Sequence, residues 1–118
     1  KDRDATFAPK ISKEFLQIKW NHETADEVVR KINALSTKYG TYTYLGKKRI
    51  KVFRAIKSSR NISALPGTIN ETKDGLQVNC KGDTSILINE LQMEGKAKLT
   101  GSEFLRGYKS LISEYPFS

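Results

Sequence analysis

The sequence predicts a mainly β, α+β domain in which short antiparallel strands form a small Greek-key barrel. Five or six short segments alternate apolar with polar residues or are rich in β-branched and aromatic residues, and turn signals separate them. Two other segments, one early and one C-terminal, repeat apolar residues at helical spacing. The 118 residues suit one domain, which can bury roughly two-thirds of its unfolded surface. An OB-like barrel is therefore the first architecture expected, and a split sandwich is the second.

The N-terminal segment is expected to be extended. Pro9 fixes its own φ and disfavours helix for the residue before it, so Asp4–Ile11 reads as an entry segment. The sequence LQIKW then alternates apolar and polar residues, which predicts a short strand. Its apolar residues are expected on one face: Leu16, Ile18 and Trp20.

The clearest helix is expected over Thr24–Leu35. Thr24 and Glu27 form a T-x-x-E capping box, in which each side chain accepts a hydrogen bond from the other residue's backbone N–H. An apolar stripe at i, i+3, i+4 spacing follows, and the helix is expected to end near Ser36. The stripe consists of Ala25, Val28, Val29, Ile32 and Leu35.

A β-hairpin is expected next. Thr41–Leu45 is β-branched and aromatic throughout, and Gly46–Lys47 reads as the turn. In the following strand, RIKVFRAIK, Arg54 falls among the apolar positions, and a β-bulge or the barrel rim is expected there because an unpaired buried arginine is very costly. Alternation places Ile50, Val52 and Ile56 on one face and Arg49, Lys51 and Phe53 on the other.

The second half of the chain supplies the remaining strands and the last helix. A polar loop over Ser58–Ala64 leads to a strand opened by PGTI, and the turn sequences D-G and KGD introduce two more strands. Gln92–Ser102 reads as a loop. Thr100 and Glu103 form a second capping box, and Pro116 ends the helix. The apolar stripe of this helix consists of Phe104, Leu105, Tyr108, Leu111 and Ile112.

The charge balance favours a polyanionic partner. The net charge is +8 and the pI is about 9.6, which suits nucleic acid or an anionic membrane. Nucleic acid is preferred, because no apolar run approaches the roughly 18 residues of a membrane span. No signal peptide is visible, and a start at Lys1 rather than Met suggests a piece of a longer chain.

No catalytic or metal site is expected. One cysteine and one histidine exclude a disulfide framework and a multi-cysteine zinc site. Cys80 is expected to be a small buried hydrophobe, His22 a solvated loop residue, and the single thiol fits a cytoplasmic protein. Glycine-rich phosphate loops, H-E-x-x-H and G-x-S-x-G are all missing from the sequence.

The strongest functional signal is the segment Gly46–Arg60, which holds seven lysines and arginines and no acidic residue. Residues i and i+2 of a strand lie about 7 Å apart on one face, a spacing similar to that of successive phosphates. Tyr39, Tyr42 and Tyr44 precede this segment and could stack unpaired bases. The alternative is a solvated face whose lysines block edge aggregation, with the tyrosines as ordinary cross-strand partners.

Three stretches resemble one known family. ATFAPKI with IKW resembles the linker and first strand of the methionyl-tRNA formyltransferase C-terminal domain, PGTI its mid-domain turn, and LQMEGKAKLTGSEFLRGY its closing loop and helix. The order and spacing match over nearly the whole chain. By this resemblance, residues 1–14 are an interdomain linker and residues 15–118 an OB-like tRNA-binding domain.

The resemblance implies a division of labour. An N-terminal Rossmann-type domain, outside this chain, would bind 10-formyltetrahydrofolate and carry the Asn–His–Asp catalytic set. This domain would hold initiator methionyl-tRNA, with Lys10 at the mouth of the basic channel, in a monomeric cytoplasmic enzyme. The candidate tRNA-binding residues are Lys10, Lys47, Lys48, Arg49, Lys51, Arg54, Lys57, Arg60, Lys96 and Lys98.

Two departures from the family pattern leave other roles open. The family commonly has N-P-W-P where this chain has STKYG, and methionine where it has Leu99. The alternatives are a structural domain of a sugar-nucleotide or folate formyltransferase, and a free-standing OB-like module that binds single strands without specificity.

Overall fold

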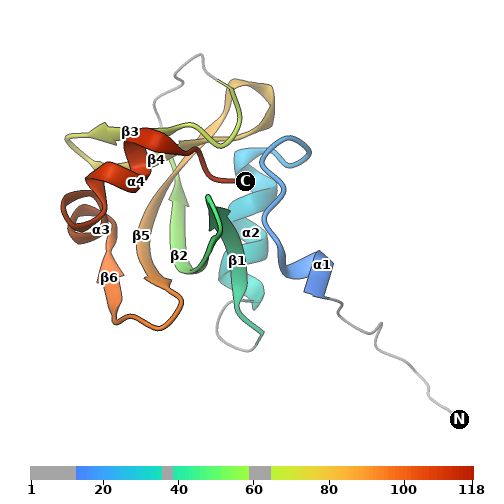
Figure 1. The fold of residues 1–118 in the computed structure, drawn as a ribbon. Helices are drawn as coiled ribbons and strands as arrows, with labels where there is room; N and C mark the ends of the chain where they lie inside the picture. Colours follow the sequence, from blue (N-terminus) through green and yellow to red (C-terminus); the bar gives the residue numbers. More distant parts are fainter. Residues whose placement is uncertain (1–12, 36–38, 59–64) are drawn as a thin grey trace, which may run out of the picture.

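The computed structural model describes residues 13–35, 39–58 and 65–118 (Figure 1). Its strands are β1 (Thr41–Leu45), β2 (Lys48–Lys57), β3 (Ile69–Thr72), β4 (Gly75–Asn79), β5 (Ser85–Met93) and β6 (Lys98–Thr100). Its helices are α1 (Lys13–Leu16), α2 (Ala25–Leu35), α3 (Gly101–Gly107) and α4 (Lys109–Glu114), with a 3₁₀ turn at Lys81–Asp83. The strands form one antiparallel sheet in the order β1-β2-β5-β4-β3, and β6 also pairs with β5.

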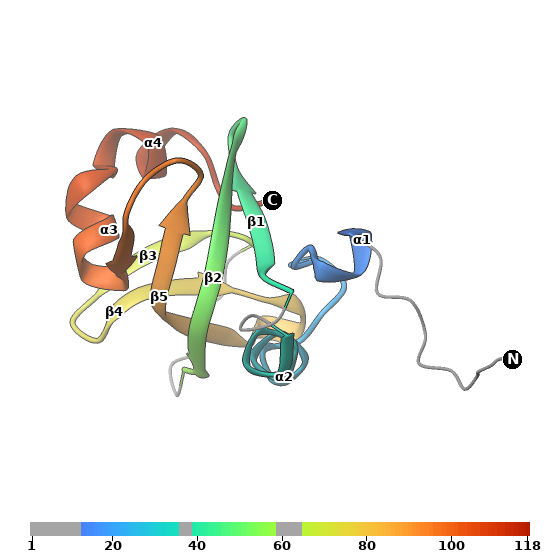
Figure 2. The same cartoon turned by 90° about the horizontal axis from the view of Figure 1, so that it is seen from below.

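The predicted α+β class is confirmed, and the sheet curls into a barrel-like domain. Figures 1 and 2 show α2 on one side of the curled sheet and α3 with α4 on another. The single late helix predicted from the sequence is wrong in one respect. It breaks into α3 and α4 at Tyr108, whose φ of −127° and ψ of 34° are not helical.

Residues 117 and 118 join the two sides of the sheet. The backbone N–H of Phe117 donates to the carbonyl of Gly67 at 2.9 Å, and Ser118 exchanges two 2.9 Å hydrogen bonds with Tyr44 of β1. Gly67 in turn donates to the carbonyl of Asn79 in β4 at 2.8 Å. Backbone hydrogen bonds therefore run around the whole barrel, from β1 through Phe117 and Gly67 to β4.

The glycine of PGTI is required by this closure. A Cβ added to Gly67 would lie 2.3 Å from the carbonyl oxygen of Phe117, and its φ of +91° disfavours other residues. Trp20 covers the same junction. Its ring stacks on that of Phe117, with the ring centroids 5.9 Å apart, and its Nε1–H donates to Thr43 Oγ1 at 2.8 Å.

The segment LQIKW is buried as predicted, but it is not the expected strand. Leu16, Ile18 and Trp20 are all buried. Leu16 ends α1, and the backbone pairing of this segment with β1 amounts to one isolated bridge between Gln17 and Tyr42, with the Ile18 N–H donating to the Tyr42 carbonyl at 2.8 Å. The chain then turns away towards α2, so its contact with the edge of β1 is too short to form a strand.

Strand β2 contains the bulge that the sequence predicted. Its register with β5 shifts on both sides of Arg54, which is exposed. One extra residue reverses the inside-outside alternation beyond this point. Ala55 is therefore buried, and the prediction that Ile56 faces the core is wrong, because Ile56 is 51% exposed.

Both predicted capping boxes form. At α2, Thr24 N–H donates to Glu27 Oε1 at 2.9 Å and Glu27 N–H donates to Thr24 Oγ1 at 3.4 Å. At α3 the corresponding distances between Thr100 and Glu103 are 2.9 and 3.2 Å. The hydrogen bond from the capping backbone lowers the pKa of Glu27 and of Glu103, because it favours the carboxylate.

Candidate nucleic-acid interface

The candidate surface lies on the outer face of β1, β2, β5 and β6. The strand register places Tyr42, Lys51, Gln92 and Lys98 in one row across these strands. Ile50 and Val52, the neighbours of Lys51, point into the core, so Lys51 points outward. We call Tyr42, Arg49, Lys51, Phe53, Gln92 and Lys98 the hairpin face.

Arg49 is held in place on this face. Its guanidinium lies 5.5 Å from the centroid of the Tyr42 ring, and its Nη2 is 3.9 Å from Glu94 Oε2. Tyr42 is itself supported by an edge-to-face contact with Tyr44, with ring centroids 5.6 Å apart. A cation over an aromatic ring is a favourable arrangement that also orients the guanidinium.

Lys98 forms a second cation–aromatic pair on the hairpin face. Its Nζ lies 4.5 Å from the centroid of the Phe53 ring. The prediction that Gln92–Ser102 is entirely a loop is wrong, since Lys98–Thr100 pairs with β5 as β6. This strand brings Lys98 onto the same surface as Lys51, whereas Lys96 stays in the exposed turn before it.

Two hollows lie on either side of Arg49 and Lys51. One, of about 240 Å³, is lined by both of these residues together with Leu16, Tyr39, Gly40 and Tyr42. The other, of about 130 Å³, is lined by the same two residues with Gln92, Glu94 and Gly95. Sequence reasoning missed Gln92 and Glu94, because only the β2–β5 register brings them beside the basic residues.

The remaining candidates are divided among several places. Lys47 and Lys48 are exposed at the β1–β2 turn. Beyond the bulge, Arg54 lies opposite Glu90 in the register, and Lys57 Nζ is 3.4 Å from Asp26 Oδ2 on α2. Lys10 and Arg60 lie outside the described residues, and so does most of the predicted loop 58–64.

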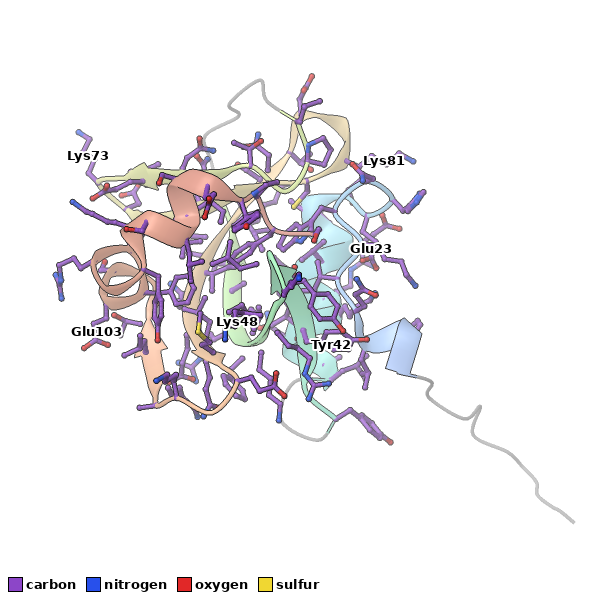
Figure 3. All side chains as sticks on the ribbon, in the orientation of Figure 1. Glu23, Tyr42, Lys48, Lys73, Lys81 and Glu103 are labelled. Carbon is purple, nitrogen blue, oxygen red and sulfur yellow. The ribbon has the colours of Figure 1, made fainter. Side chains whose placement is uncertain are left out.

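Basic charge is not confined to the hairpin face. Figure 3 shows Lys73 and Lys81 on opposite sides of the molecule. Both are exposed. They are useful controls, because they carry the same charge as Lys51 and Lys98 at positions away from that face.

Cys80 and His22 lie apart from this surface. Cys80 is 1% exposed, and burial raises the pKa of its thiol to about 12, so it is buried as predicted and mostly unreactive near neutral pH. His22 is exposed in the loop before α2. Within the described ranges, no three His, Cys, Asp or Glu side chains are grouped to hold a metal ion. Nor is any helix there long and apolar enough to span a membrane.

Comparison with models of known protein families shows which family this chain belongs to. A family model described as formyl transferase, C-terminal domain, matches residues 10–109. The chain belongs to this family. The resemblance seen in PGTI and in the closing loop and helix is thereby confirmed.

Curated relatives of this formyl transferase C-terminal domain carry the name methionyl-tRNA formyltransferase. The relative from Syntrophus aciditrophicus is 33% identical over 109 residues, which are 92% of this chain and 34% of the relative. That from Citrifermentans bemidjiense is 38% identical over 104 residues, 87% of this chain and 31% of the relative. The Bacillus subtilis relative is 32% identical over 107 residues, which are 90% of this chain and 33% of the relative. The chain thus spans about a third of the length of the curated relatives it matches.

Solved structures share the fold of this formyl transferase C-terminal domain. A crystal structure of a HypX variant from Aquifex aeolicus matches with a TM-score of 0.72 at 17% identity, over 92% of this chain and 19% of that one. HypX in complex with tetrahydrofolic acid gives a TM-score of 0.68 at 18% identity, over 87% of this chain and 18% of that one.

Proposed function

We propose that this chain is the tRNA-binding C-terminal domain of a methionyl-tRNA formyltransferase, which formylates the α-amino group of initiator methionyl-tRNA in translation initiation. The observation that supports this most is the identity of 32–38% to enzymes of that name across most of the chain. The net charge of +8 supports a polyanionic partner. In this proposal residues 15–118 are the tRNA-binding domain and residues 1–14 the linker.

The domain contributes binding and orientation. Arg49, Lys51 and Lys98 would contact phosphates, and such contacts fix the position of the nucleic acid without reading its sequence. Lys47, Lys48 and Lys96 would add to the basic field around this face, whereas Arg54 and Lys57, which lie beside Glu90 and Asp26, are weaker candidates. Lys10 and Arg60 remain candidates from the sequence alone. Holding the acceptor end in one orientation lowers the entropic cost of reaction at a distant catalytic centre.

The chemistry would be carried out elsewhere in the parent protein. An N-terminal Rossmann-type domain would bind 10-formyltetrahydrofolate and transfer its formyl group. We propose that the parent enzyme is a cytoplasmic monomer whose two domains enclose the tRNA.

Fluorescence anisotropy of the chain with initiator tRNA, an elongator tRNA and a single-stranded RNA, over a salt series, tests this proposal. The double variant Lys51→Glu/Lys98→Glu should bind tRNA at least about tenfold more weakly at low salt, because both positions face the phosphates. The matched variant Lys73→Glu/Lys81→Glu has the same change in net charge and should lose less than about threefold.

The possible outcomes of these titrations lead to different conclusions about the function of the domain. A preference for folded tRNA, together with the difference between the two double variants, supports the proposal. Equal losses in both variants would show that only net charge matters, as in a nonspecific polyanion binder. Failure of the unaltered chain to bind any RNA at low salt would instead favour a structural domain of another formyltransferase.

A further inference from the structure

We propose that the 240 Å³ hollow beside β1 is a subsite for one unpaired nucleotide, whose base stacks on Tyr39 while its phosphate contacts Arg49 and Lys51. This inference rests on the proposed function, because it assigns a specific part of the RNA to a specific part of the hairpin face. The ligand class follows from what lines the hollow.

The lining combines aromatic and cationic groups. Tyr39, Tyr42 and Leu16 supply apolar surface, and Arg49 and Lys51 supply two positive charges. A free inorganic anion would use only the charges, and an apolar peptide side chain would use only the rings. A nucleotide has both a planar aromatic base and a phosphate, so it uses the entire lining.

The size of the hollow suits a single base. Its volume of about 240 Å³ lies just below the roughly 300–1,000 Å³ typical of sites for drug-sized ligands. A paired base within a helix has both faces stacked and cannot offer one to a protein ring. Only an unpaired base, from a loop, bulge or end, can be splayed out onto an aromatic side chain.

Tyr39 is presented by an anchored backbone. Its N–H donates to the carbonyl of Leu35 at 2.8 Å, and the N–H of Gly40 donates to the same carbonyl at 3.1 Å, so both are fixed to the end of α2. Gly40 has a φ of +81°, a left-handed conformation that glycine adopts without strain. The side chain of Tyr39 remains 46% exposed, which leaves ring surface for a ligand.

The two cations of this hollow, Arg49 and Lys51, follow one another along β2. Arg49 and Lys51 line both this hollow and the 130 Å³ hollow beside Gln92 and Glu94. Being i and i+2 on β2, they lie about 7 Å apart along the strand. Arg49 is also oriented by the Tyr42 ring at 5.5 Å and by Glu94 at 3.9 Å. The phosphate of the bound nucleotide and that of its neighbour would therefore meet two cations, of which Arg49 is already oriented.

The test compares a ten-nucleotide single-stranded RNA with an abasic version of the same length, which keeps the phosphates but lacks the bases. Tyr39→Ala should weaken binding of the normal RNA about tenfold, as expected for one lost stacking contact, and leave the salt slope unchanged. Tyr39→Phe keeps the ring and should bind within about twofold of the unaltered chain. Tyr115→Ala removes a tyrosine of similar exposure, 41%, that lines neither hollow, and should have no effect.

A second readout detects the stack itself. A 2-aminopurine base in the RNA should lose fluorescence on binding to the unaltered chain and to Tyr39→Phe, but not to Tyr39→Ala. Because Tyr39 is half exposed, both Tyr39 variants should show the circular dichroism spectrum and thermal unfolding of the unaltered chain.

The inference is overturned if abasic and normal RNA bind equally, or if Tyr39→Ala binds the normal RNA as tightly as the unaltered chain. Its failure is distinguishable from failure of the proposed function. Loss of tRNA affinity in Lys51→Glu/Lys98→Glu, with no discrimination against abasic RNA, would leave the tRNA-binding proposal standing and reject the subsite. The absence of binding to any RNA would reject both.

Discussion

The two halves of β2 carry similar sequences but present their charges differently. Before the bulge, Arg49 and Lys51 lie on the hairpin face, beside aromatic rings and two hollows. At the bulge, Arg54 lies opposite Glu90, and beyond it Lys57 Nζ is 3.4 Å from Asp26 Oδ2. A stretch of the sequence that contains no acidic residue is therefore divided into two surfaces. Arg49 also has an acidic neighbour, Glu94, so the halves differ in the aromatic rings and hollows that lie beside the cations of the first half.

The bulge at Arg54 is the cause of this division. It keeps the arginine out of the core, and it also reverses which residues of β2 face inward. From the sequence alone, all the charges of β2 would be assigned to one interface. The positions of the side chains instead favour the half of β2 next to the β1–β2 turn as the nucleic-acid interface.

The largest expected difference between the halves concerns stability. Ile50→Ala should lower the free energy of unfolding by about 3 kcal/mol, because it leaves a cavity where a fully buried side chain was. Ile56→Ala should lower it by no more than about 0.5 kcal/mol, since this side chain is half exposed. Urea denaturation measures both. Equal losses would show that the bulge does not separate the two halves.

The next difference concerns RNA affinity. Lys48→Glu/Lys51→Glu should weaken tRNA binding about tenfold at low salt, whereas Arg54→Glu/Lys57→Glu should weaken it less than about threefold. The two variants have the same net charge and change residues of the same strand, so anisotropy titrations compare position alone. A greater loss beyond the bulge would move the interface towards α2.

A smaller effect is expected on the salt dependence. Lys51→Gln should reduce the magnitude of the log-affinity against log-salt slope by about 0.9, if this lysine neutralises one phosphate of a duplex region. Lys57→Gln should change the slope less, because the Asp26 carboxylate 3.4 Å from that ammonium opposes the approach of a phosphate. If the two slopes change equally, both lysines contact phosphate.

The smallest effect is expected for the ion pair itself. Both partners of the Lys57–Asp26 pair are more than half exposed, at 55% and 59% of their side chains. Asp26→Asn should therefore change the free energy of unfolding by about 0–1 kcal/mol. Released from its partner, Lys57 should raise tRNA affinity by less than about twofold. A clear rise beyond that would show that Asp26 shields a phosphate-binding lysine.

Local patterns in the sequence predicted much of this fold. The Thr24–Glu27 and Thr100–Glu103 boxes set the starts of α2 and α3, and the cost of burying Arg54 predicted the bulge. These features depend on residues close together in the chain, so the sequence contains the information needed to place them.

Features that depend on distant partners were not predictable in the same way. Alternation placed Ile56 inside, because the effect of a bulge on the residues after it depends on the register with β5. The sequence pattern predicts a loop at Lys98, although pairing with Gln92 makes its segment a strand. Similarly, nothing near Lys57 in the sequence indicates that Asp26, 31 residues away, lies beside it.

The closure of the barrel by Phe117 and Ser118 has a consequence for how the chain folds as it is synthesised. Until these two residues leave the ribosome, Tyr44 and Gly67 lack the backbone partners that join the two sides of the sheet. An open sheet with unpaired edges can pair with other chains. Nascent chains that end at residue 116 and are held outside the ribosome by a linker should therefore be more sensitive to protease and to aggregation than chains that carry Phe117 and Ser118 ahead of the same linker.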